Sequence, residues 1–155
     1  MRDVAESDLP IFFEQQLDQA ANYMAAFTAR DPADRNAFNA HWKKILSDDT
    51  VTIRTILLDR HVAGSVASWV DTKWLGKPEV TYWIGKEYWG KGLATKALSE
   101  FLKIQKTRPL YARAARDNIA SLRVLEKCGF KIFGYNKGIA FARGTEIEEA
   151  LLELR

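Results

Sequence analysis

The sequence predicts a single α/β domain with a mixed sheet, and three observations lead to this fold class. The first third of the chain places apolar residues at the three- and four-residue spacing of helices. The middle and the end carry short runs rich in β-branched residues, as strands do. Two further helical segments alternate with these strands, so that two strands are joined through a helix and should lie parallel.

Length and composition favour one ordinary globular domain over residues 1–155. A chain of 155 residues that is 47% hydrophobic and 28% charged has the size and make-up of one soluble domain. No apolar run approaches the roughly 18 residues that cross a bilayer. The start, "MRDVAESDLP", is polar and acidic, unlike a secretory or transit signal. We therefore expect a cytoplasmic protein without a membrane partner.

Charge and cysteine content exclude further classes. The formal net charge of +3 is spread along the chain, whereas nucleic-acid binding needs a concentrated basic face. Nucleic acid is not an expected partner, but a small anionic ligand is compatible. The single cysteine, Cys128, excludes an internal disulfide and a multi-cysteine zinc site, and its apolar neighbours suggest a buried hydrophobe. His41 and His61 have no partners at a recognisable spacing, so no metal site is expected.

The first half of the chain predicts two helices and three strands. One helical segment spans residues 9–27, with Asp8 as a plausible N-cap, and a second spans residues 36–46. Two β-branched runs over residues 51–70 are separated by the turn-sized "LDRH" and predict an antiparallel hairpin. A third strand follows "GKP" and ends near Ile84.

The second half predicts two helices and three more strands. "KGLATKALSEFLKIQK" has one apolar and one polar face, as an amphipathic helix does. "PLYARAA" is a short strand, and the helix in "DNIASLRVLEKCGF" can be capped by Asp117 or Asn118 and ended by Gly129. Two closing strands lie near residues 131–142 and 146–154. About four helices should therefore flank a six-stranded sheet.

The stretch "YWIGKEYWGKGLATKAL" raises the question of ligand binding, because a strand passes into a helix through Gly90 and Gly92. The first N–H groups of a helix lack internal partners and carry partial positive charge. No Ser, Thr, Asp or Asn precedes this helix to cap it, and Lys91 adds a positive charge. A bound phosphate would complete the helix end, although two glycines can also simply make a tight turn. Neither a G-x-x-x-x-G-K-[ST] loop nor a dinucleotide-type G-x-G-x-x-G is present.

"WGKGLA", an amphipathic helix, a short strand and "NIASLRVLEKCGF" follow one another in an order that resembles the GCN5-related N-acetyltransferase (GNAT) superfamily, particularly its branch of ribosomal-protein N-terminal acetyltransferases. "RDVAESDLP" is similar to that family's entry into its first helix, so the resemblance covers nearly the whole chain. The family's turn has the form Q/R-x-x-G-x-G/A. Gly92 and Ala94 match this pattern, whereas Trp89 replaces the usual Gln or Arg.

The resemblance implies a GNAT fold, in which two central parallel strands of a mostly antiparallel sheet splay apart, and acetyl-CoA as the cosubstrate. Backbone amides of the glycine turn would hold the pyrophosphate, and the first splayed strand and Asn118 would hold the pantetheine arm. The implied cofactor-binding residues are Tyr82, Trp83, Ile84, Trp89, Gly90, Lys91, Gly92, Leu93, Ala94, Thr95 and Asn118. Plain strand core for the three strand residues and a simple N-cap for Asn118 are the alternatives.

Acyl transfer to an amine needs a base for the amine and a proton for the departing thiolate. The resemblance points to Glu79 as the base, with Asp71 as the other nearby carboxylate and an exposed strand-end charge as the alternative for Glu79. Ser121 could return the proton, where many relatives use a tyrosine.

The expected function is direct N-acetylation of a primary amine, either a protein N-terminus or a small amine. A non-catalytic acyl-CoA sensor on the same fold is the alternative. The sequence does not identify the acceptor or the oligomeric state, for which a homodimer is our expectation.

Overall fold

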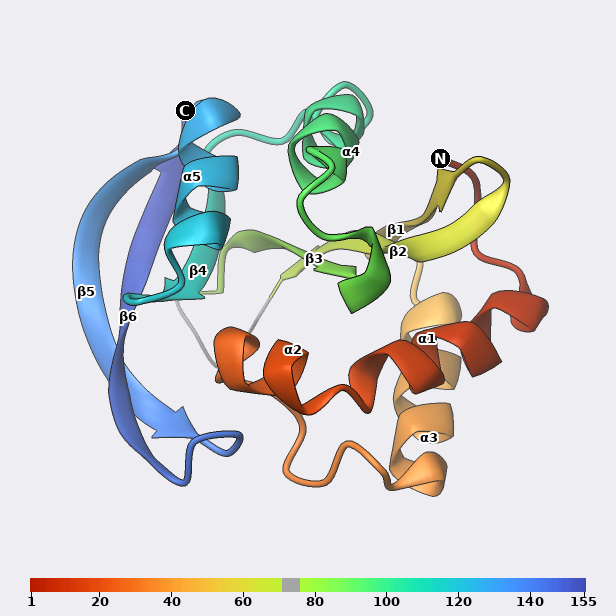
Figure 1. Ribbon diagram of the computed structural model, residues 1–155. Coiled ribbons are helices and arrows are strands. Elements are labelled where there is room, and N and C mark those ends of the chain that lie inside the picture. Colours follow the sequence, from red (N-terminus) through yellow and green to blue (C-terminus); the bar gives the residue numbers. More distant parts are fainter. Residues whose placement is uncertain (71–75) are drawn as a thin grey trace.

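The computed structural model describes residues 1–70 and 76–155. Six strands form one sheet in the order β1-β2-β3-β4-β6-β5. Helices α4 and α5 cover one face of this sheet, and α1, α2 and α3 lie on the other side (Figure 1). The α/β class with a mixed sheet, predicted from the periodicities, is confirmed.

The helices and strands have well-defined bounds. The α-helices are α1 (Leu9–Gln16), α2 (Gln19–Ala25), α3 (Arg35–Leu46), α4 (Leu93–Phe101) and α5 (Ile119–Lys127), with short 3-10 turns at Glu6–Asp8 and Lys86–Tyr88. The strands are β1 (Thr52–Leu58), β2 (His61–Val70), β3 (Pro78–Ile84), β4 (Leu110–Ala115), β5 (Lys131–Ala140) and β6 (Thr145–Leu154).

The first helical segment differs from its prediction, because residues 9–27 form two helices instead of one. The carboxylate of Asp18 accepts a hydrogen bond from the Ala21 N–H at 2.8 Å and starts α2 as an N-cap. This cap requires an extended Asp18 backbone, which breaks the helix after Leu17. Apolar periodicity does not register such a break, because apolar residues recur at helical spacing on both sides of it.

Asp8 does not cap α1, and that prediction was wrong. Its carboxylate accepts two hydrogen bonds from the Arg2 guanidinium, at 2.7 and 2.8 Å, and one each from the Ala5 N–H and the Thr55 hydroxyl. Arg2 also pairs with Thr55 as an isolated bridge beside β1. The fully buried Asp8 therefore ties the start of the chain to the sheet.

The predicted hairpin and the predicted parallel pair are both confirmed. Asp59 and Arg60 have positive φ values of 50° and 68°, as the residues of a tight two-residue hairpin turn do. Strand β3 pairs with β2 along its whole length, and β4 pairs with β6 likewise. Between β3 and β4, by contrast, Glu79↔Tyr111 is the one parallel pair recorded in the described chain. The two central strands therefore separate beyond this pair.

The main core lies between the sheet and the α4/α5 layer, and it fixes both helices beside the splayed strands. Leu98, Phe101, Leu110 and Leu125 are among its fully buried members. Helix α5 ends as predicted at Gly129, whose φ is +99°, and the Phe130 N–H reaches back to the Leu125 carbonyl at 3.1 Å.

Candidate active site

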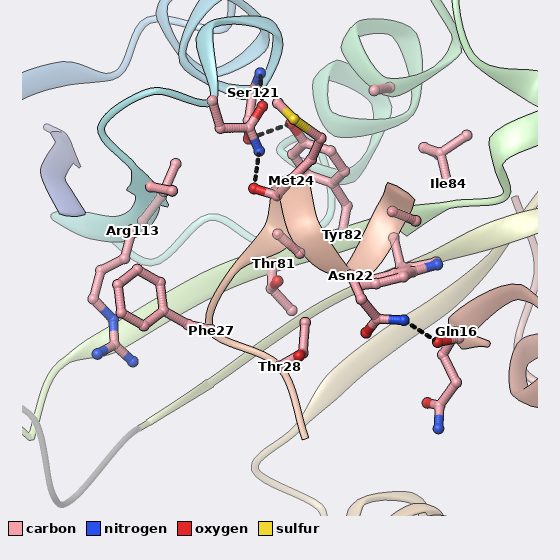
Figure 2. A pocket seen from close by; sticks show the side chains of 18 of the residues that line it. Gln16, Asn22, Met24, Phe27, Thr28, Thr81, Tyr82, Ile84, Arg113 and Ser121 are labelled. Carbon is pink, nitrogen blue, oxygen red and sulfur yellow. Dashed lines mark hydrogen bonds between the residues drawn. The ribbon is translucent and has the colours of Figure 1, made fainter. Parts of the chain in front are cut away.

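A cavity of about 1050 Å³ extends along the opening between β3 and β4. The glycine turn, the start of α4 and the start of α5 line it on one face of the sheet, and the end of α2 lines it on the other. It thus reaches both faces, which allows two substrates to meet from opposite sides. Figure 2 labels residues of α2, β3, β4 and α5 around the pocket.

The glycine turn leaves the start of α4 open to a ligand. Gly92 is the N-cap residue in left-handed conformation, with φ +71°, and no side chain caps the helix. Gly90 also has a positive φ, of +76°. A Cβ built on either glycine would meet nothing within 4 Å. The first-turn residues line the cavity, and no side chain caps their N–H groups at the positive end of the helix dipole, an arrangement that fits a phosphate group.

Trp89 has a structural contact that the sequence did not reveal. Its indole N–H donates to the Ile84 carbonyl at 2.9 Å and so ties the glycine turn to the end of β3. A Gln or Arg at this position would offer a polar group to a ligand. Here the aromatic residue positions the backbone of the turn instead.

The backbone of β3 presents an open edge to the cavity. The Gly85 N–H donates to the Ala63 carbonyl of β2 at 2.8 Å. Because backbone groups alternate along a strand, the N–H of Ile84 points the other way, toward β4. The Ile84 side chain is 7% exposed and belongs to the core. The side chain of Ile84 is therefore part of the core, as one interpretation had it, and its backbone lines the cleft, as the other had it.

Tyr82 and Ser121 meet at the wall of the cavity. The Tyr82 hydroxyl and Ser121 Oγ are 2.8 Å apart and hydrogen-bonded (Figure 2). Burial raises the pKa of the Tyr82 phenol, and the hydrogen bond with Ser121 opposes this shift only in part. The phenol consequently keeps its proton at neutral pH. The sequence predicted that Tyr82 would line the pantetheine arm, but it did not predict a role for the Tyr82 hydroxyl. Tyr82 and Ser121 are distant in the sequence, so no local pattern indicates their hydrogen bond.

Asn118 joins the two layers around the cavity. Its Oδ1 accepts from the Ser121 N–H at 3.2 Å, so it caps α5 as the alternative prediction required. Its Nδ2 donates to the Met24 carbonyl of α2 at 3.1 Å. A sharp turn follows at the fully buried Ala26, whose φ is +64°, and brings Phe27 and Thr28 to the cavity.

Glu79 lies on the α2 face of the sheet and is buried, with 3% exposure, so the alternative of an exposed strand-end charge was wrong. Its carboxylate binds Arg113 on β4 through Nε at 2.6 Å and Nη2 at 3.3 Å. Glu149 on β6 approaches Arg113 Nη1 at 3.8 Å. Glu79, Arg113 and Glu149, which we call the carboxylate ladder, cross three strands in the cavity wall.

Sequence reasoning missed Arg113 and Glu149. A charged residue inside the apolar run "LYARAA" was the available signal for Arg113, since the strand is otherwise buried. Burial raises the pKa of the Glu149 carboxyl, although Arg113 and a side-chain hydrogen bond with Asn136 partly offset it. Asp71, the other predicted base, lies outside the described residues.

The cysteine and the histidines have no assigned role in the site. Cys128 is partly buried, its thiol lies 3.7 Å from the Thr95 carbonyl, and burial raises its pKa. Burial also lowers the pKa of His41, which lines the cavity. Within residues 1–70 and 76–155, no cluster of three or more His, Cys, Asp or Glu side chains could hold a metal ion. In the same residues, no helix is long and apolar enough to span a membrane.

Solved structures show the same fold at low sequence identity. Ribosomal-protein-alanine N-acetyltransferase from Brucella melitensis matches with a TM-score of 0.80 and 18% identity, over 98% of this chain and 96% of its own. Spermidine N-acetyltransferase from Vibrio cholerae, in complex with CoA and spermine, matches with a TM-score of 0.80 and 17% identity, over 99% of this chain and 92% of its own. Mycobacterium smegmatis RimJ, in complex with CoA-disulfide, matches with a TM-score of 0.80 and 20% identity, over 99% of this chain and 79% of its own.

A comparison with curated protein sequences finds no match. The family described as the Acetyltransferase (GNAT) domain, however, matches residues 1–131. That match covers most of the chain, including the glycine turn, the splayed strands and α5. The predicted resemblance is therefore confirmed, and the chain belongs to the GNAT family of acetyltransferases.

Proposed function

We propose that this enzyme transfers the acetyl group directly to a primary amine, either a protein N-terminus or a small amine, while both substrates occupy the cavity. The observation that carries the proposal is the cavity itself, which joins an uncapped helix start to a buried carboxylate through the open edge of β3. Structural neighbours include enzymes named for ribosomal-protein alanine and for spermidine, which supports both acceptor types.

The residues on the α4/α5 side would bind the cosubstrate. Backbone N–H groups from Gly90 to Thr95 would hold the pyrophosphate, with Lys91 adding positive charge, while the Trp89 N–H is bound to the Lys86 carbonyl. The β3 edge from Tyr82 to Ile84 and the side chain of Asn118 would hold the pantetheine arm. When bound, acetyl-CoA supplies an activated acyl carbon with a thiolate leaving group. The Ile84 N–H would face the thioester oxygen, where it would stabilise developing negative charge.

Proton transfer would use residues on both sides of the opening. As the amine nitrogen bonds to the acyl carbon and the carbon–sulfur bond breaks, the nitrogen loses one proton and the sulfur gains one. Glu79 would accept the proton from nitrogen, through water because its carboxylate is buried and bound to Arg113. Ser121 would deliver the other proton to sulfur, and its bonded partner Tyr82 would replace that proton and regain its own from solvent.

The experiment combines binding and turnover. Acetyl-CoA should raise the melting temperature, and thiol release should then depend on the presence of an amine. An acyl-CoA sensor, the alternative function, would be stabilised without releasing thiol on any amine of the panel. If acetyl-CoA at millimolar concentration gave no stabilisation and no heat of binding, the proposal would be wrong.

A homodimer and a cytoplasmic location stay predictions from the sequence. Light scattering of the purified chain in solution would settle the first of these.

A further inference from the structure

We propose that Thr28 binds the acceptor through its hydroxyl, and that Arg143 positions Thr28 from outside the cavity. The inference rests on the proposed function, because it names residues for the acceptor half of the cavity, the part that α2 lines. It is carried by a strained turn at the end of α2, by the contacts that hold this turn, and by a buried hydroxyl that has no hydrogen-bond partner in the described residues.

The chain leaves α2 through a γ-turn at Ala26. This residue has φ +64° and ψ −59°, and the Phe27 N–H donates to the Ala25 carbonyl at 2.7 Å. A γ-turn with positive φ is rare and strained for a residue that has a side chain. Ala26 is fully buried and packs with Ala115 of β4 and Ala140 of β5. A strained turn persists only where its surroundings fix it, and such turns are frequent at ligand sites.

Arg143, in the turn between β5 and β6, fixes the end of α2. Its Nε donates to the Tyr23 carbonyl at 2.9 Å, and its guanidinium carbon lies 4.4 Å from the centre of the Tyr23 ring. Its Nη1 and Nη2 donate to the two carboxylate oxygens of Asp117, at 2.5 and 2.8 Å. The Arg143 side chain is 8% exposed, although it comes from a hairpin turn. One guanidinium therefore joins α2 to the start of α5.

Two further hydrogen bonds hold the same stretch of backbone. The Asn118 side chain donates to the Met24 carbonyl at 3.1 Å, and the Ala142 N–H donates to the Ala26 carbonyl at 3.4 Å. The contacts of Arg143 are charge-assisted and, toward the carboxylate, bidentate, which makes them stronger than a hydrogen bond between neutral groups. Arg143 should therefore be the principal attachment of the turn.

The turn places Phe27 and Thr28 in the wall of the cavity (Figure 2). Gly138 confines the Phe27 ring there, since a Cβ at this glycine would lie 3.1 Å from it. The Thr28 hydroxyl oxygen is buried and has no hydrogen-bond partner within residues 1–70 and 76–155. Such an unmet hydrogen bond is costly and uncommon. Rotation about the Cα–Cβ bond exchanges the hydroxyl with the methyl group, so a bound acceptor can pair with the hydroxyl.

The test measures kcat, KM for the amine and the dissociation constant of acetyl-CoA, with an alanine-initiated tetrapeptide and with spermidine as the amines. Thr28→Val removes the hydroxyl at nearly constant shape. It should raise KM about tenfold with little change in kcat or in acetyl-CoA affinity, as the loss of one hydrogen bond to the bound substrate does. Thr28→Ser should restore the wild-type KM.

Arg143→Lys keeps the positive charge but cannot make the forked contacts. It should raise KM about fivefold, because a displaced turn weakens the hydrogen bond of Thr28. The double variant of Thr28→Val and Arg143→Lys should stay within a factor of about two of Thr28→Val alone, because Arg143 acts on the acceptor through Thr28. Without any turnover, hydrogen exchange at the amides of residues 23–28 should be faster in Arg143→Lys.

Arg116→Lys serves as the matched control. Arg116 also pairs with a carboxylate, that of Glu148, at 3.0 Å, and lies 4.3 Å from the centre of the Tyr135 ring. It is 55% exposed, however, and both partners belong to the β5–β6 pair and not to α2. This variant should keep the wild-type KM and the wild-type exchange at residues 23–28.

Three results would each overturn the inference: an unchanged KM in Thr28→Val, a loss that Thr28→Ser does not restore, or equal effects of Arg143→Lys and Arg116→Lys on KM and exchange. Failure to bind acetyl-CoA, or thiol release that no amine increases, would instead contradict the proposed function. The Thr28 variants remain decisive even if Arg143→Lys does not fold.

Discussion

Two buried carboxylate–arginine clusters in this chain use the same chemistry for different ends. Asp8 receives two hydrogen bonds from Arg2 and further ones from Ala5 and Thr55, so one anion faces one cation with its oxygens satisfied. The carboxylate ladder sets two anions around Arg113 in the wall of a large cavity. A cluster enclosed by its own partners stabilises the fold, whereas titratable groups in the wall of a large cavity are suited to binding and catalysis.

The largest effect that separates the two clusters should come from Glu79→Gln. We expect kcat/KM for the amine to fall by about 100-fold, because removal of a general base costs at least this much. Affinity for acetyl-CoA, measured by calorimetry, should stay within a factor of about two, since Glu79 lies on the acceptor face of the sheet. Asp8→Asn is the matched control, and its activity below its melting temperature should equal that of the wild type. Equal losses of activity in both variants would contradict the assignment of Asp8 to stability and Glu79 to catalysis.

Acid titration should reveal the stabilising role of Asp8. The Arg2 guanidinium, together with the Ala5 and Thr55 hydrogen bonds, lowers the pKa of Asp8 from 3.8 to about 2, against the opposing effect of burial. A folded-state pKa below the unfolded one gives stability that is present above pH 4 and is lost as the pH falls toward 2. This carboxylate should contribute about 2 kcal/mol to the free energy of unfolding at neutral pH.

Urea unfolding of the wild type and of Asp8→Asn at several pH values measures this contribution. Their difference in unfolding free energy should shrink through the same acid window. A difference that stays constant down to pH 2 would show that Asp8 stabilises the fold without its charge.

The smallest of these effects should come from the hydroxyl pair at the opening. Tyr82→Phe and Ser121→Ala should each lower kcat by about tenfold, since each removes one hydrogen-bonding group from a proton path that water can partly replace. The double variant should lose little more than either single one, because the two hydroxyls act as one unit. Additive losses, together with weaker acetyl-CoA binding, would indicate separate structural roles.

The sequence was sufficient where local patterns decide the structure. Strand composition, the helix ends at Asn118 and Gly129, and the glycine turn are local, and each was predicted correctly. The break at Asp18 was missed although its cap is local, because the apolar spacing continues across it. The displacement of Asp8 from its expected cap was missed because its partner Thr55 is distant in the chain.

The candidate site divides in the same way. Its cofactor half follows from a contiguous motif, whereas its acceptor half is assembled from three strands that are distant in the chain. Arg113 and Glu149 become neighbours of Glu79 only through the strand order β3-β4-β6. Single-residue signals in "LYARAA" and "TEIEEALLEL" could mark an unusual charge, but they could not identify its partner.

Calorimetric titration of Gly92→Asn and Gly92→Asp with acetyl-CoA tests whether the start of α4 binds the pyrophosphate. Both residues tolerate the left-handed conformation of Gly92, so the pair differs mainly in charge. We expect the Asp variant to bind acetyl-CoA about tenfold more weakly than the Asn variant, owing to repulsion between the carboxylate and the phosphates. Equal affinities in the two variants would contradict it.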